Sequence, residues 1–305
     1  MTIERQVGWF AAMRAAVLAT LGRGRWWLLA LATFLLRGGL LLLIPPLVVL
    51  PTPADLASIV PPSVSGTGLA NPTPTLAALL IVTVLVVLGL VVVTTLVGTW
   101  LDLTLVEAAA DDEELEVVGL PDALRRIPLD AAIEVRLAAH LPTAVALGVG
   151  LIGLGDALTA ELTAPQAGTP LLIRVLLDTP ITTGAIVVAW LVGEAWGGLA
   201  VRRLATTRST LTALRHGLID LVRPGGLATL VLTTLVVGVP LVVLWLSTGR
   251  AFDRLWPLLV ESPDASIVLL ALGLLVGTWG AGLWLLGIAL AWRSAAWTAE
   301  VLRRT

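Results

Sequence analysis

Six long apolar segments constrain the fold of this chain more than any other feature of its sequence. They lie at residues 26–49, 76–100, 138–156, 181–200, 225–247 and 265–291. A helix that crosses a bilayer needs about 20 apolar residues, and these segments are apolar around their full circumference. We therefore predict an all-α integral membrane protein with six transmembrane helices.

The composition supports a lipid environment and excludes several kinds of partner. Hydrophobic residues make up 57% of the chain and charged residues 13%, whereas a soluble domain has about 25% charged residues. The formal net charge of -2 provides no basic field for nucleic acid. We expect the lipid bilayer to be the main partner and expect no nucleic-acid partner.

No residue pattern in the sequence indicates catalysis. The chain has no cysteine and only two histidines, His140 and His216, so disulfides, thiolate ligands and histidine-rich metal sites are not expected. It also lacks a glycine-rich phosphate loop and the common hydrolase motifs. We predict no enzymatic activity, no metal and no cofactor.

The distribution of arginine predicts the orientation. Segments 1–25, 101–137, 201–224 and 292–305 hold 15 of the 19 basic residues, all arginine, and the segments on the other side hold three. Such a bias places the arginine-rich side in the cytoplasm. We predict a multi-pass inner-membrane protein with cytoplasmic N- and C-termini. The charged residues of 1–25, with no small-residue cleavage site, are not typical of a signal peptide.

Two short motifs recur in order and predict a threefold internal repeat. One reads Leu-Val-Gly and begins at Leu96, Leu191 and Leu275; the other is an Ala-Met/Leu-Arg string that begins at Ala12, Ala123 and Ala213. Each unit would contain an in-plane helix followed by a helical hairpin. We expect one membrane domain, 1–305, with repeats at about 1–110, 111–204 and 205–305.

The predicted in-plane helices carry arginine on one side and apolar residues on the other, as helices at a membrane interface do. Two arginines mark each copy, and both could lie near lipid phosphate. The candidate headgroup contacts are Arg14, Arg23, Arg125, Arg136, Arg215 and Arg223. These helices either anchor the bundle or form a docking surface for a protein subunit or a headgroup.

One polar pair is expected inside the membrane. Arg37 follows Trp26 by eleven residues, which places it about 16 Å into the apolar layer at about 1.5 Å per residue. An ionised arginine at that depth is costly and is usually functional. Glu194 lies well inside another apolar segment. We predict that the two share a polar site, either to fix helix order or to serve function.

Other polar and small residues are given simpler interpretations. We interpret the acidic run 111–116 as a solvated loop and Asp102 as a marker of a span boundary. Glycines recur through 265–291, with Gly273 and Gly277 at GxxxG spacing. This favours a central position for the last span and leaves a dimer seam, and so a homo-oligomer, as the alternative.

The Arg-bearing segment from Ala213 to Arg223 and the ending from Trp292 to Glu300 resemble bacterial six-helix membrane domains. That group includes the membrane domains of glycerophosphodiester phosphodiesterases and their stand-alone relatives. The resemblance implies a six-helix membrane fold. It implies no phosphodiesterase activity, because the chain shows no such catalytic domain.

Two functional hypotheses follow from these patterns. The first is a non-catalytic membrane scaffold or accessory subunit that binds another membrane or cytoplasmic protein. The alternative is a transporter or permease for a lipid or small molecule, with Arg37 and Glu194 lining its path.

Overall fold

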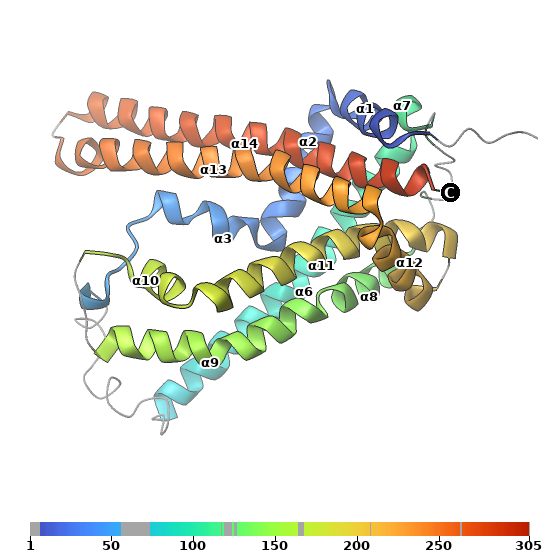
Figure 1. The fold of residues 1–305 in the computed structure, drawn as a ribbon. Helices are drawn as coiled ribbons and strands as arrows, with labels where there is room; N and C mark the ends of the chain where they lie inside the picture. The colour runs from blue at the N-terminus through green and yellow to red at the C-terminus, as the bar shows by residue number, and fades with distance from the viewer. Residues whose placement is uncertain are drawn as a thin grey trace, which may run out of the picture. The chain divides into compact units, whose positions relative to one another are not determined.

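The computed structural model describes residues 7–55, 74–116, 118, 124, 127–163, 168–207, 209–262 and 264–304. The regular elements in this part of the chain are helices (Figure 1). Six of them are long and apolar enough to cross a membrane, which confirms the predicted all-α fold with six spans. The spans are α2 (Gly24–Phe34) with η1 (Leu35–Gly39) and α3 (Leu40–Leu43), α6 (Pro74–Ala110), α9 (Leu141–Thr163), α11 (Pro180–Thr207), α13 (Pro224–Glu261) and α14 (Ala265–Leu302).

Several helices extend well beyond the apolar segments that predicted them. The helix α6 ends at Ala110 rather than near residue 100, and α14 ends at Leu302 rather than near 291. The backbone hydrogen bonding of a helix continues until a residue caps or breaks it, whereas hydropathy reports only the part suited to lipid. These extensions carry charged residues, among them Asp102 in α6 and Glu300 in α14.

The first span is broken where its arginine lies. Gly38 has φ +96°, a value that glycine adopts without steric cost, and Arg37 just before it has φ −89° and ψ +28°. The next residue, Gly39, lies so close to the ring of Phe34 that a Cβ there would be 2.3 Å from it. Two consecutive glycines therefore allow the chain to bend at the level of Arg37.

A short helix precedes each odd-numbered span. These helices are α1 (Trp9–Thr20), α8 (Leu129–Ala139) and α12 (Thr210–Val222). Their order fits the predicted repeating unit, but the motif glycines differ in environment: Gly98 packs against Arg37, whereas Gly277 is exposed with open space beside it. The threefold repeat itself stays a prediction. The remaining elements are η2 (Pro45–Leu47), α7 (Glu113–Glu116) and α10 (Leu171–Asp178).

The chain divides into two compact units. The first unit contains Met1–Leu47, Thr95–Ala139 and Ala195–Thr305, and the second contains Val48–Thr94 and His140–Glu194. The unit borders fall inside α6 and α11, so these two helices contribute one part to each unit.

The helix α14 is the centre of the first unit over its C-terminal half only. It runs beside α13, and α1 and α2 pack against it (Figure 1). Most residues from Leu286 to Leu302 are buried, and Gly287 lets the backbone of Trp27 approach closely. By contrast, Gly273, Gly277 and Gly280 are exposed with room for a side chain. The helix is therefore central in this unit through its C-terminal half, whereas the glycine-rich half that motivated the expectation is exposed.

The second unit packs α9 against the first part of α11. A Cβ at Gly150 would lie 2.8 Å from Thr182, so the two helices approach closely at this glycine. The helix α10 is held to α9 by two hydrogen bonds of 2.5 and 2.8 Å that Arg174 donates to Glu161.

Candidate functional site: a buried arginine cluster

A carboxylate and three arginines gather inside the first unit. They are Asp102 of α6, Arg37 of η1, Arg136 of α8 and Arg202 of α11. We call these four residues the Asp102 cluster. Its members come from elements far apart in the sequence, and each lies in or beside a membrane-spanning helix.

Asp102 is buried because α6 continues past Trp100 instead of ending there. Its Oδ2 accepts a short hydrogen bond from Arg136 and lies 3.6 Å from Nη2 of Arg37. The residue is only 6% exposed. The sequence-based interpretation of Asp102 as a boundary marker is therefore wrong: this carboxylate is the acidic centre of a polar cluster.

The break in the first span places Arg37 against α6. Its Nη2 donates a 3.0 Å hydrogen bond to the carbonyl oxygen of Gly98, one helical turn before Asp102. A Cβ at Gly98 would lie 3.4 Å from the Arg37 side chain, which is a van der Waals contact, so the arginine packs directly against α6 at this glycine. Arg37 thus binds a carboxylate and a backbone carbonyl of the same neighbouring helix.

Arg136 lies across two helices at once. While its guanidinium pairs with Asp102 on α6, its side chain passes Gly197 of α11, where a Cβ would lie 3.3 Å away. Arg136 is 4% exposed. The glycine leaves the space in which this arginine reaches the carboxylate.

Arg202 joins α11 to α14 through neutral acceptors. Its Nε donates to Oγ1 of Thr298 at 2.9 Å, and its Nη2 donates to the hydroxyl and carbonyl oxygens of Ser294 at 2.8 and 3.1 Å. A further bond of 2.9 Å goes to the carbonyl of Gly198 on its own helix. At 2% exposure, Arg202 is the largest of the fully buried side chains.

The cluster contains more positive than negative charge. It holds three guanidinium groups and one carboxylate, and Arg37 and Arg202 also donate to carbonyl and hydroxyl groups of neighbouring helices. Arginine has no acceptor and does not lose its proton in proteins, so the cluster is unsuited to carrying protons through these side chains. It is suited to fastening helices together.

Glu194 has a different partner in the second unit. Its Oε1 lies 3.1 Å from Nε2 of His140, just before α9 begins, and Thr143 lies 3.5 Å from the other ring nitrogen. Arg37 and Glu194 belong to different units, and each has a partner within its own. The predicted pairing of Arg37 with Glu194 stays a prediction.

Four of the predicted headgroup contacts have exposed side chains: Arg14, Arg23, Arg215 and Arg223. Arg136 departs from that expectation, because it is buried in the Asp102 cluster. Arg125 lies outside the described residues. Arg23 also forms a short ion pair with Asp112 and lies over the ring of Trp26, 4.9 Å from its centroid.

The acidic run 111–116 is not a uniformly solvated loop, contrary to the sequence-based interpretation. Asp112 is buried beside Arg23, and residues from Glu113 to Glu116 form the short helix α7, which packs against α1. Nowhere in the described ranges do three or more His, Asp or Glu side chains gather as a metal site would require.

The six apolar helices define a multi-pass α-helical membrane protein, with a charged cluster buried in its first unit. No protein-family model matches the chain, and neither a curated protein nor a solved structure is detectably similar to it.

Proposed function

We propose that this chain is a non-catalytic scaffold or accessory subunit of the cytoplasmic membrane, with both termini in the cytoplasm. The observation that carries the proposal is the packing of the Asp102 cluster: its charged groups bind fixed partners on neighbouring helices. Side-chain exposure is 14% for Arg37, 8% for Asp102 and 5% for Arg136. Groups so enclosed are suited to holding helices in place.

The cluster links five elements into one frame. Arg37 ties η1 to α6, Arg136 ties α8 to α6, and Arg202 ties α11 to α14. Without water, helices in lipid associate through packing and interhelical hydrogen bonds, so such bonds give the frame its specificity. Such a frame, with the short helices α1, α8 and α12 beside it, is suited to binding a protein subunit.

A transporter or permease for a lipid or small molecule is the second candidate. The observation that favours it is the break in the first span at Arg37 and Gly38. Broken spanning helices often form the substrate sites of transporters. In this hypothesis Arg37 and Glu194 would line the path.

Cysteine accessibility separates the two hypotheses, since the parent chain has no cysteine. Thr99 is buried beside Gly98, and Thr212 is exposed on α12. Under the scaffold hypothesis, Thr99→Cys reacts with a water-soluble thiol reagent only after denaturation, while Thr212→Cys reacts at once. Rapid reaction of Thr99→Cys in the native protein would favour the transporter.

The orientation is tested with the same chemistry in intact cells. Ser262 lies between α13 and α14, and Thr212 lies at the opposite end of α13, on α12. An impermeant thiol reagent is expected to label Ser262→Cys and to spare Thr212→Cys. The reverse pattern would overturn the cytoplasmic placement of the termini.

A further inference from the structure

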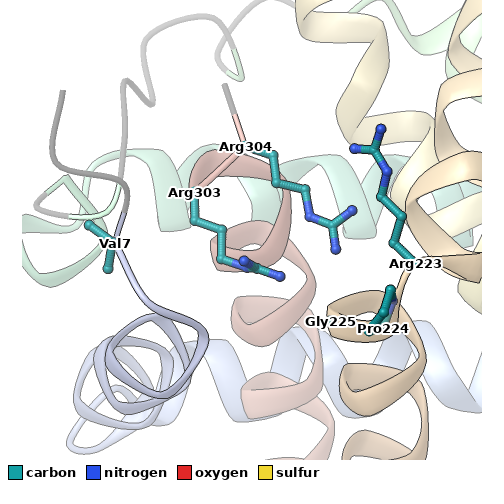
Figure 2. A pocket seen from close by; sticks show the side chains of 6 residues that line it. All are labelled: Val7, Arg223, Pro224, Gly225, Arg303 and Arg304. Atoms are coloured by element: carbon teal, nitrogen blue, oxygen red, sulfur yellow. The ribbon is translucent and has the colours of Figure 1, made fainter. Parts of the chain in front are cut away.

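A second set of arginines surrounds a cavity at the end of the first unit where α14 finishes. The cavity has a volume of about 410 Å³ and is lined by Val7, Arg223, Pro224, Gly225, Arg303 and Arg304. Figure 2 shows Arg303 and Arg304 extending from the end of α14, with Arg223 on the other side, where α12 passes into α13. We call this cavity the Arg223 pocket.

The ion pairs around the Arg223 pocket leave a surplus of positive charge. In the described part of the chain, Asp220 pairs with Arg203 at 2.6 Å, with Arg304 at 3.0 Å and more distantly with Arg223 at 3.6 Å. Glu300 pairs with Arg303 at 2.6 Å and forms a short pair with Arg304. Four guanidinium groups, of which three line the cavity and Arg203 does not, thus share two carboxylates, which leaves two positive charges in this set of residues.

The acidic residues here are buried, and one of the arginines is well exposed. The side chain of Glu300 is 0% exposed and that of Asp220 is 4% exposed, whereas Arg223 is 57% exposed. Arg303 and Arg304, at 16% and 11%, line the cavity while paired with these carboxylates. An anion that enters therefore meets Arg223 as its most accessible donor.

The start of α13 adds to this positive field. Arg223 is the N-cap residue and its side chain caps no backbone N–H, and the first N–H groups of a helix have no partner within it. A Cβ on Gly225 would lie 2.1 Å from Nη2 of Arg303, so the glycine lets that guanidinium lie against the helix start.

We propose that the Arg223 pocket binds the phosphate monoester headgroup of an anionic phospholipid. A phosphate monoester carries about −1.5 to −2 charges at neutral pH, which matches the two surplus positive charges. Lipid is the favoured source because the pocket lies at the ends of two spanning helices. Beside it, Val222 and Leu227 are 59% and 46% exposed, as expected of residues that contact acyl chains.

The test measures the thermal stability of the detergent-purified protein during titration with short-chain phosphatidic acid, phosphatidylglycerol or inorganic phosphate at constant ionic strength. Phosphatidic acid is expected to raise the melting temperature at the lowest concentration, since phosphatidylglycerol is a diester with one charge. In Arg223→Gln the apparent affinity for phosphatidic acid should fall by about tenfold, because a charged hydrogen bond to phosphate is lost.

The matched control is Arg250→Gln, which removes an exposed arginine near the other end of α13, outside the pocket, and should bind like the parent. Gly225→Ala, which displaces Arg303, provides a second variant that should weaken binding. Equal affinity in Arg223→Gln and the parent would overturn the site. An equal response to inorganic phosphate would overturn the assignment to lipid. Neither result bears on the scaffold proposal, because these variants leave the Asp102 cluster intact.

Discussion

The Asp102 cluster and the ion pairs around the Arg223 pocket each contain two more guanidinium groups than carboxylates. The spare hydrogen-bond donors have different surroundings in the two places. In the cluster, the spare donors bind the carbonyl of Gly98 and the hydroxyl groups of Ser294 and Thr298. In the pocket, they face a cavity of about 410 Å³. Where neutral acceptors surround the extra arginines, these arginines therefore hold helices together. Where an open cavity lies beside them, they are available to an external anion.

If this comparison is correct, the largest loss of stability should follow from replacing Asp102, the single carboxylate of the cluster. Asp102→Leu removes the buried carboxylate that pairs with Arg37 and Arg136. Breaking a buried ion pair in this way costs about 3–5 kcal/mol. We expect a marked drop in the melting temperature of the purified protein. A melting temperature within a degree or two of the parent would mean that the carboxylate does not hold the cluster.

A smaller loss of stability is expected from replacing Arg202, whose hydrogen-bond acceptors are neutral. Arg202→Met loses its hydrogen bonds to α14 but also removes a buried charge that repels Arg37 and Arg136. These terms oppose each other, so we expect a net loss of about 1–2 kcal/mol. Thermal unfolding in detergent measures it. A loss as large as that of Asp102→Leu would contradict this difference between charged and neutral partners.

The order of these two effects was not predictable from the sequence. Apolar length predicted six spans, and the depth of Arg37 identified it as a buried polar residue. Its contacts with Asp102 and Gly98 were not predicted, because helix packing selects them. Asp102 was misinterpreted because the apolar run ends near residue 100 while α6 continues to Ala110. Recognising that the helix continues past the apolar run to Ala110 would have placed Asp102 inside α6 instead of at its end.

Two arginines of the Arg223 pocket escaped sequence analysis for a related reason. Arg223 was predicted as a headgroup contact, but Arg303 and Arg304 were given no role beyond the orientation of the chain. Only the return of α14 beside the start of α13 brings them to one cavity (Figure 2). Such proximity depends on tertiary structure, and no local pattern in a single sequence indicates it.

The smallest effects should separate glycines that serve the cluster from those that do not. A Cβ at Gly197 would lie 3.3 Å from Arg136, whereas Gly273 has open space. We expect Gly197→Ala to cost about 1 kcal/mol or more through overpacking. Gly273→Ala should stay within about 0.5 kcal/mol of the parent. Melting temperatures of the two variants, measured side by side, check this; equal losses would contradict it.

The double-mutant cycle of Asp102 and Arg136 tests the central claim most directly, because it isolates the contact on which the frame depends. The unfolding stability of Asp102→Leu, Arg136→Leu and the double variant is compared with that of the parent in the same detergent. Removing both members of a buried pair is often tolerated far better than removing one. We predict that the double variant recovers a large part of the loss seen in either single variant. A double variant whose loss equals the sum of the two single losses would show that the pair does not hold the helices together.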